Sequence, residues 1–333
     1  MRLVTIDSLT LGTELAMPVR TYSGNVILNI GISITENYIQ RLKQLGVNSV
    51  YVRDDRFNDV DNIESLDYRT KNSAIKVLKD VHNALNKGST INEYVIKDVA
   101  KYIVDFAIQT SSKGVSILAT EVSDEQIFEH SVNVALLSAF IGQRMGYNYI
   151  QLSDLVVGAL IHDLGREGKD ENTEHVQKAF DYFRKMRGLN LHSSVVCLEH
   201  HEKYDGTGFP RKISGTSISE YSRIVKVADV YEGILHGYNN SQPIMPHQAY
   251  ETLLAMSGSD VDPEIVKVFR DAIVFYPNGC AVQLSNGLKA VVIRQNQGSP
   301  HRPVIRVFSD SGVIGEINLV KSLTIFIKDV IMS

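Results

Sequence analysis

The chain of 333 residues is longer than one typical domain of about 100 to 200 residues, and its hydrophobic fraction of 44% is sufficient for a core without disulfide support. A formal charge of −4 gives the protein no excess of basic residues, which argues against binding to the phosphate backbone of DNA or to an anionic membrane. The two cysteines lack CxxC spacing, the N-terminus does not read as a signal peptide, and there is no run of about 18 apolar residues. We therefore expect a cytoplasmic protein without membrane insertion.

The N-terminal residues 1–60 are predicted to form a small α/β unit of regulatory type. Short β-prone runs at Leu15–Val19 and Val26–Leu28 indicate a hairpin. Apolar residues at helical spacing over 39–45 predict a helix, and residues 50–52 read as a strand.

Residues 61–115 are predicted to form a helical pair that links this unit to the rest of the chain. Apolar positions recur at helical spacing from 63 to 84 and again from 95 to 106. Stripes of this kind are usually core, but a pair that leads into a catalytic domain is also a candidate homodimer surface.

Residues 116–277 are predicted to be helical throughout. Ser123 and Gln126 have the spacing of a capping box at the first helix of this segment. The expected helices run from 123 to 146, 156 to 164, 174 to 186, 193 to 203, 222 to 235, 247 to 256 and 263 to 275. A constrained loop is expected over 204–210, where two glycines and a proline interrupt the pattern.

The C-terminal residues 278–333 have a different character. Short β-prone runs separated by turn signals predict strands at 282–284, 290–293, 304–308 and 323–327. The fold class is therefore predicted as mainly α, a helical bundle with a small N-terminal α/β unit and a small C-terminal β module.

A pattern of histidines and aspartates points to metal binding within the helical segment. An apolar helix runs into His162 and Asp163, a pair that is weak evidence alone. Its companions in the same segment strengthen it: His130, His175, His200, His201 and Asp229. Imidazole and carboxylate together are ligands that a first-row divalent metal accepts.

Three motifs of this segment resemble those of the HD-GYP family, a branch of the HD phosphohydrolases that hydrolyses cyclic di-GMP. His162-Asp163-Leu164-Gly165-Arg166 is similar to HDxGK, and the run from His200 to Pro210 is similar to HHExxDGxGYP. The run from Ser222 to Asp229 is similar to ARIxxxAD. The resemblance covers about half of the chain, from 116 to 277, and the second motif is highly specific. The resemblance implies that this segment is a catalytic domain with an HD-type helical bundle fold.

The resemblance implies a ligand set for two divalent ions, with iron or manganese as the expected metals and Asp163 as the bridge. The implied ligands are His130, His162, Asp163, His175, His200, His201 and Asp229. Asp163 and Arg166 are the implied catalytic residues. The expected substrate-binding residues are Arg166, Lys203, Asp205, Gly206, Gly208, Phe209 and Arg211. His192 and four further histidines, His82, His236, His247 and His301, are left without a role.

The sequence departs from the family in ways that concern the third metal and the substrate. Gln126 stands where members with three metals place a glutamate, which favours two ions. The loop before His175 is short, which predicts a more open site. Arg166 replaces a lysine, and Phe209 replaces the tyrosine of GYP and loses its hydroxyl. The arginine after the last aspartate is absent, with Tyr238 near its place.

The leading hypothesis is a binuclear phosphodiesterase that converts cyclic di-GMP to linear pGpG by a metal-bridging hydroxide, in bacterial second-messenger signalling. The departures leave weak activity open. One alternative is a degenerate HD-GYP protein that binds a cyclic dinucleotide and signals to a protein partner without turnover. Another is an HD hydrolase for a different nucleotide or phosphate ester. Intact ligands favour catalysis, whereas missing substrate contacts favour the alternatives.

Overall fold

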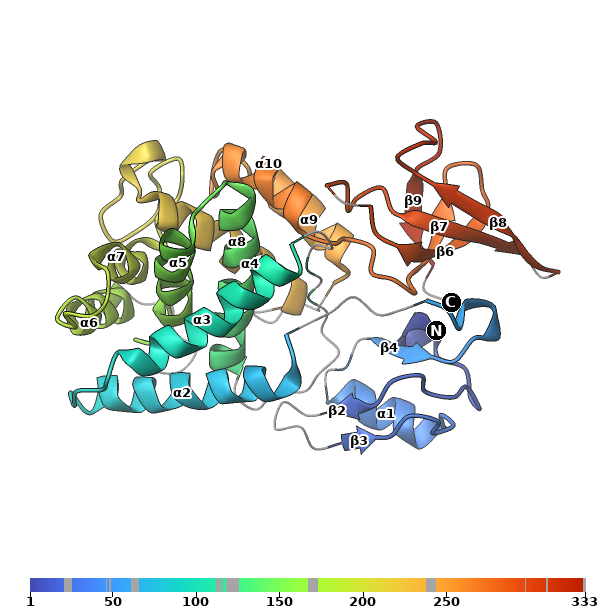
Figure 1. Ribbon diagram of the computed structural model, residues 1–333, viewed down its shortest axis with the longest axis horizontal. Helices are drawn as coiled ribbons and strands as arrows, with labels where there is room; N and C mark the ends of the chain where they lie inside the picture. The colour runs from blue at the N-terminus through green and yellow to red at the C-terminus, as the bar shows by residue number, and fades with distance from the viewer. Residues whose placement is uncertain are drawn as a thin grey trace.

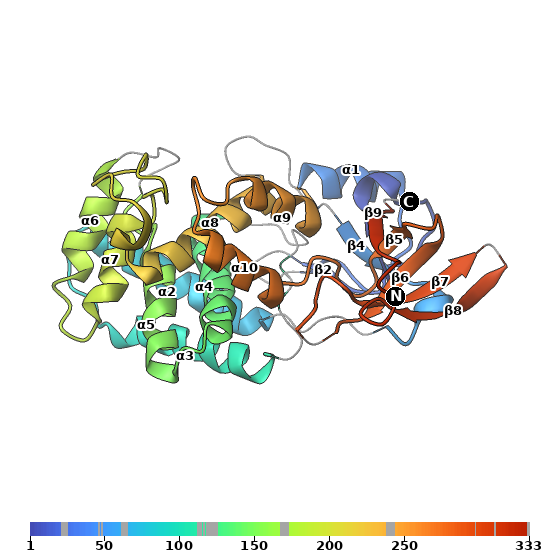
Figure 2. The same cartoon turned by 90° about the horizontal axis from the view of Figure 1, so that it is seen from above.

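The computed structural model describes residues 1–20, 26–45, 47, 49–60, 66–111, 115, 117, 126–166, 173–237, 244–296, 298–309 and 311–331. The predicted fold class is confirmed: the chain is mainly α-helical, with a small N-terminal unit and a small C-terminal sheet. The helical bundle lies at one end of the long axis, and the two smaller parts share the other end (Figures 1 and 2). Among the described residues, no helix combines the length and the hydropathy that crossing a membrane requires.

The N-terminal unit contains the predicted hairpin, helix and strand, together with one further strand. Strands β2 (Val19–Arg20) and β3 (Val26–Leu28) pair antiparallel, and α1 (Glu36–Gln44) packs on them through buried residues. Strand β4 (Ser49–Val52) pairs antiparallel with β1 (Arg2–Thr5), which the sequence analysis did not predict. Strand β1 is short and has no alternation of apolar and polar residues, because its two central residues, Leu3 and Val4, are both buried.

The nine helices α2 to α10, counted over the described residues, share one continuous hydrophobic core. Their bounds are α2 (Tyr68–Asn86), α3 (Tyr94–Gln109), α4 (Gln126–Arg144), α5 (Tyr149–Ile161), α6 (Thr173–Phe183), α7 (Leu191–Glu199), α8 (Glu220–His236), α9 (Pro246–Ala255) and α10 (Pro263–Ala272). Helix α4 packs against both α5 and α8, so these three helices form the centre of the bundle. The capping box predicted at Ser123, and the side chain of Gln126, lie outside the described residues.

Two helix boundaries differ from the prediction in a way that matters for the site. Helix α5 begins at Tyr149 rather than 156, because Asn148 and Gln151 form a capping box at its start. It ends at Ile161, and α7 ends at Glu199, both earlier than predicted. As a result the histidine that follows each helix occupies its C-cap position.

The helical pair α2 and α3 buries its apolar stripes in the common core. Leu78 of α2 and Ile103 of α3 are fully buried, whereas Tyr94 and Tyr102 of α3 are 63% and 61% exposed. The apolar stripe is therefore used within one chain. A homodimer through residues 61–115 stays a prediction, and it would have to use the outer face of the pair.

The C-terminal module is a five-stranded antiparallel sheet in the order β8-β7-β6-β5-β9. Its strands are β5 (Ala281–Leu284), β6 (Lys289–Arg294), β7 (Val304–Ser309), β8 (Gly312–Asn318) and β9 (Ile327–Val330). The prediction for 323–327 is wrong, because residues 321–326 form turns and coil and the strand begins at Ile327. Strand β8 was not predicted, since its glycines read as a turn and its apolar residues Val313 and Ile314 are exposed.

The N-terminal unit and the C-terminal sheet are joined by direct contacts. The Leu3 amide donates to the Gly279 carbonyl at 2.9 Å. Gly279 has a φ of 86°, and a Cβ there would lie 3.2 Å from Leu3 N, so only glycine fits without strain. Phe57 is fully buried in the cluster that it forms with Ala281 and Val291 of the sheet. The domain boundaries given above stay a prediction.

Replacement of Phe57 by alanine tests this junction. The aromatic ring packs edge-on against Phe308 with centroids 5.6 Å apart, and its loss leaves a cavity between the two parts. We expect the free energy of unfolding to fall by about 3–5 kcal/mol, measured by chemical denaturation. Ile314→Ala, at a side chain that is 62% exposed, is the control. A Phe57→Ala protein as stable as this control would contradict the packing described.

Candidate metal centre

Seven histidine and aspartate side chains converge inside the helical bundle, in two groups. The first group is Asp163, His175, His200 and His201, and the second is His130, His162 and Asp229. Within each group, one nitrogen or oxygen from every member lies within 4.8 Å of the others. The structure thus brings together all seven predicted ligands, whose assignment to metal stays a proposal.

The C-terminal end of α5 orients His162. Its Nδ1 lies 2.7 Å from the carbonyl oxygen of Ala159, and because a carbonyl only accepts, Nδ1 carries the hydrogen. Burial lowers the pKa of His162 to about 4, which outweighs the opposing effect of Asp163, so the ring is neutral at pH 7. Its Nε2 therefore holds a lone pair, and it is buried without a hydrogen-bond partner among the described residues.

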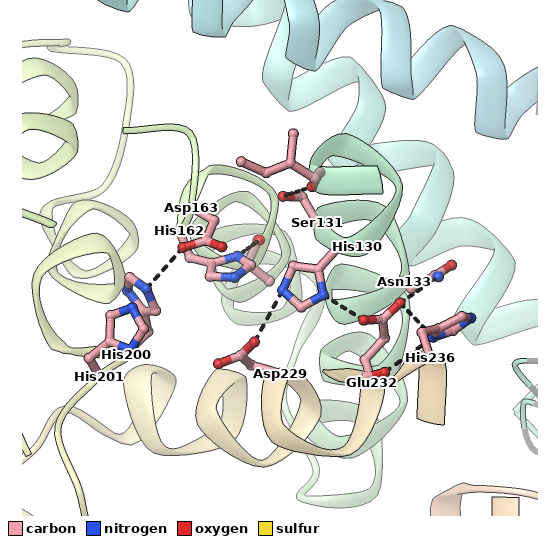
Figure 3. A network of polar contacts seen from close by, with 12 residues as sticks. His130, Ser131, Asn133, His162, Asp163, His200, His201, Asp229, Glu232 and His236 are labelled. Carbon is pink, nitrogen blue, oxygen red and sulfur yellow. Dashed lines mark hydrogen bonds and ion pairs between the residues drawn. The ribbon is translucent and has the colours of Figure 1, made fainter. Parts of the chain in front are cut away.

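The C-terminal end of α7 orients His200 in the same way. Its Nδ1 lies 3.0 Å from the carbonyl oxygen of Cys197, and its Nε2 lies 3.2 Å from Asp163 Oδ1 (Figure 3). His175, near the start of α6, places Nε2 3.7 Å from the same oxygen and 3.1 Å from His201 Nε2. Nitrogens from α6 and from the end of α7 therefore lie beside one carboxylate oxygen.

The second group connects α4 and α8 through His130. Its Nε2 lies 3.1 Å from Asp229 Oδ1, and its Nδ1 lies 2.5 Å from Glu232 Oε2 (Figure 3). A carboxylate behind a ligand histidine fixes the orientation of the ring and raises its basicity.

Glu232 is a site residue that the sequence analysis missed. It is fully buried, accepts a hydrogen bond from Asn133 Nδ2 at 2.9 Å, and lies 3.0 Å from His236 Nδ1. His236, which had no assigned role, thus supports the carboxylate that orients His130. The available signal was position, since Glu232 follows Asp229 by three residues and so shares its helix face.

Charge compensation keeps the carboxylates of the centre ionised. Burial alone would raise the pKa of Asp163, but the contact with His200 and the charge of Arg166 hold it well below its usual value. Burial would likewise raise the pKa of Asp229, and His130 is the main cause that holds it low. Conversely, burial would lower the pKa of His130, but Glu232 and Asp229 hold it well above the ordinary range.

Two glycines of the motifs allow the close approach of neighbouring segments. A Cβ on Gly165 would overlap the carbonyl oxygen of His175, and a Cβ on Gly208 would overlap the backbone of His201 and Lys203. Larger residues at these positions would push ligand-bearing segments apart. The glycines therefore set the spacing of the centre.

Two of the predicted substrate-binding residues contact the centre. Phe209 stacks on His201, with ring centroids 4.6 Å apart and an interplanar angle of 18°. Arg166 Nη1 lies 2.7 Å from Asp163 Oδ2. Both side chains thus hold a predicted ligand, and their contact with a substrate stays a prediction.

The other predicted substrate-binding residues make contacts that build the loop after α7. Lys203 pairs with Asp260 at 2.7 Å, and the Arg211 guanidinium pairs with the buried Glu199. Asp205 accepts a hydrogen bond from the Thr207 amide at 2.8 Å, Gly206 has a φ of 86°, and Gly208 provides the close approach noted above. Their binding of substrate stays a prediction.

Several histidines lie apart from the two groups, and parts of the prediction fall outside the described residues. His82 contacts the Leu164 carbonyl, His192 packs against Tyr221, and His247 stacks on Tyr276. Tyr238 and the short loop of residues 167–172 before His175 are not among the described residues.

The donor set fits divalent metal ions. It consists of imidazole nitrogens and carboxylate oxygens, which suit first-row divalent metals. A thiolate does not contribute among the described residues, because Cys197 is buried in the core and burial raises the pKa of its thiol. The buried, partner-free Nε2 of His162 is the kind of donor that a metal ion satisfies.

Comparison with known families identifies two segments. Residues 116–265 match the HD domain family, whose members bind divalent metal, and residues 281–333 match a KOW domain associated with HD domains. The first match contains all seven predicted ligands. The second coincides with the five-stranded sheet.

The chain is also similar to curated proteins of bacteria. It is 25% identical to a cyclic di-GMP phosphodiesterase of Pseudomonas aeruginosa, over 72% of this chain and 61% of that protein. It is 26% identical to the cyclic di-GMP phosphodiesterase PdeB of Borreliella burgdorferi, over 57% and 54% of the two chains. A 3'3'-cGAMP-specific phosphodiesterase of Vibrio cholerae is 30% identical over 36% and 32%. The chain thus spans less than two thirds of the length of these relatives.

Replacement of Glu232 by glutamine tests the orientation of His130. Glutamine keeps the shape but removes the charge that holds the Nδ1 hydrogen, so we expect manganese to bind about 10- to 100-fold more weakly in a chelator competition titration. The matched control is Glu264→Gln, at a side chain that is 76% exposed on α10. Equal metal affinity in the Glu232→Gln and control proteins would show that Glu232 does not support the centre.

Proposed function

Because residues 116–265 are an HD domain of the HD-GYP type, we propose that the chain is a metal-dependent phosphodiesterase of cyclic dinucleotides, with cyclic di-GMP as its substrate. The observation that carries the proposal is the convergence of seven histidine and aspartate donors in two adjacent groups. Relatives named as cyclic di-GMP phosphodiesterases support the choice of substrate.

We assign one divalent ion to each group, with iron or manganese as the metal. Asp163, His175, His200 and His201 would hold the first ion, and His130, His162 and Asp229 the second, with Asp163 as the bridge. Two such ions supply Lewis-acid stabilisation of the attacking and leaving oxygens in an in-line displacement.

The protein's own residues hold this arrangement before the substrate binds. The backbone carbonyls at the ends of α5 and α7 direct Nε2 of His162 and His200 inward. Glu232 and Phe209 restrain His130 and His201 from behind. Such preorganisation lowers the reorganisation needed in the transition state.

The proposed reaction consumes one water molecule. Its oxygen forms a bond to one phosphorus of cyclic di-GMP, the bond from that phosphorus to the 3′-oxygen breaks, and the leaving oxygen takes up a proton. The product is linear pGpG, with a 5′-phosphate at one end and a free 3′-hydroxyl at the other. Arg166 is the proposed catalytic cation, because its Nη1 lies 2.7 Å from Oδ2 of Asp163, the carboxylate that would bridge the two ions.

A second substrate is favoured by one comparison. A relative that is 30% identical over its matched segment is named as specific for 3'3'-cGAMP. This dinucleotide has the same pair of phosphodiester linkages and differs in one base. The ions that the two groups would hold would act on the phosphate, which both dinucleotides contain, so the assay has to include both dinucleotides.

We expect purified protein loaded with manganese or ferrous iron to convert cyclic di-GMP to pGpG, followed by chromatography. Removal of the metal with a chelator should abolish the product, and its return should restore it. Asp163→Asn should lower turnover by at least about 1,000-fold, because the carboxylate proposed to bridge the two ions is lost. Asp271→Asn, at a side chain of α10 that is 42% exposed, is the matched control.

Three outcomes would contradict this proposal in different ways. Product that persists in Asp163→Asn would rule out the metal groups as the active site. Hydrolysis of 3'3'-cGAMP alone would correct the substrate. Binding of cyclic di-GMP without any turnover, under either metal, would replace the enzyme by a nucleotide sensor.

A further inference from the structure

The cations that the sequence singled out for phosphate binding are each paired with a carboxylate. Arg166 lies 2.7 Å from Asp163, Lys203 lies 2.7 Å from Asp260, and Arg211 contacts the buried Glu199. Two of these partners, Asp260 and Glu199, lie outside the metal groups. Lys203 and Arg211 are therefore engaged in building the loop after α7.

Lys226 is a further cation near the centre, which the sequence analysis did not select. It precedes Asp229 by three residues on α8, so both side chains project from one face of the helix. Lys226 is half-buried, and no carboxylate of the described residues lies within ion-pair distance of its ammonium group. Lys226 therefore shares a helix face with a predicted ligand, and it forms no salt bridge with the described residues.

The charge of Lys226 acts on both metal groups. Burial is the main cause that lowers the pKa of His201, and the charge of Lys226 lowers it further. Lys226 also helps His130 to hold the pKa of Asp229 low. His201 belongs to the first group and Asp229 to the second, so the charge of Lys226 acts on one member of each group.

We propose that Lys226 is a substrate-binding residue whose ammonium group donates a hydrogen bond to a non-bridging oxygen of the substrate phosphodiester. The inference rests on the proposed phosphodiesterase function and names a residue for it. A phosphodiester carries one negative charge, and a half-buried lysine that forms no ion pair with the described carboxylates is an effective donor to it. The flexible lysine stem suits a point contact of this kind.

The kinetic test is Lys226→Ala in the manganese-loaded protein. Loss of a charge-assisted hydrogen bond should raise KM for cyclic di-GMP about 10- to 100-fold, with kcat and metal content little changed. Lys226→Arg, which keeps the charge, should recover most of the loss. Lys267→Ala removes the same charge from a side chain that is 66% exposed on α10, and should behave as wild type.

A binding measurement separates this inference from the proposed function. Calorimetric titration of inorganic phosphate into the manganese-loaded protein does not depend on turnover, and Lys226→Ala should bind phosphate at least about tenfold more weakly than wild type. This result, with no hydrolysis by wild type, would reject the phosphodiesterase and keep Lys226 as an anion-binding residue.

Other outcomes would overturn the assignment of Lys226. Unchanged phosphate affinity and unchanged KM in Lys226→Ala would show that the ammonium does not meet the substrate. Loss of metal from Lys226→Ala would show a structural role instead. A wild-type protein that binds neither phosphate nor cyclic di-GMP would reject both the inference and the proposed function.

Discussion

The hydrogen bond from His162 Nδ1 to the Ala159 carbonyl is the contact on which the rest of the centre depends. The last carbonyls of a helix have no partner within it, and here an imidazole at the C-cap satisfies one of them. The same bond fixes the tautomer, so that Nε2 points into the bundle with a free electron pair. His200 repeats the arrangement at the end of α7. The carbonyl groups at the ends of two helices thereby orient two of the nitrogens proposed to bind metal.

The remaining donors need a different kind of support, because they lie within helices or after a cap. His130 has its backbone bonded within α4, and the carboxylate of Glu232 orients its ring from the facing helix. His201 follows the α7 cap and is covered by the ring of Phe209. The residue that replaces the family tyrosine thus keeps a packing role that does not need a hydroxyl. Opposite charges packed together offset the cost of burying the carboxylates.

Much of the centre could be predicted from the sequence, because motif spacing identifies the ligand-type residues before their geometry is known. All seven predicted residues meet within the bundle. Their division into two groups could not be predicted, since it depends on how α4, α5, α7 and α8 cross. The contacts of Glu232, Lys203 and Arg211 depend on tertiary packing in the same way. Strand β8 was missed because an exposed edge strand shows no hydrophobic alternation, whereas the helices carried a clear period.

The count and position of bound metal test the account most directly. Crystals of the manganese-loaded protein, examined by anomalous diffraction at the manganese edge, should show two ions per chain, one beside each group, with Asp163 contacting both. Metal analysis in solution should give the same ratio of two per chain. A single ion, a third ion, or ions away from His162 and Asp163 would contradict the arrangement proposed here.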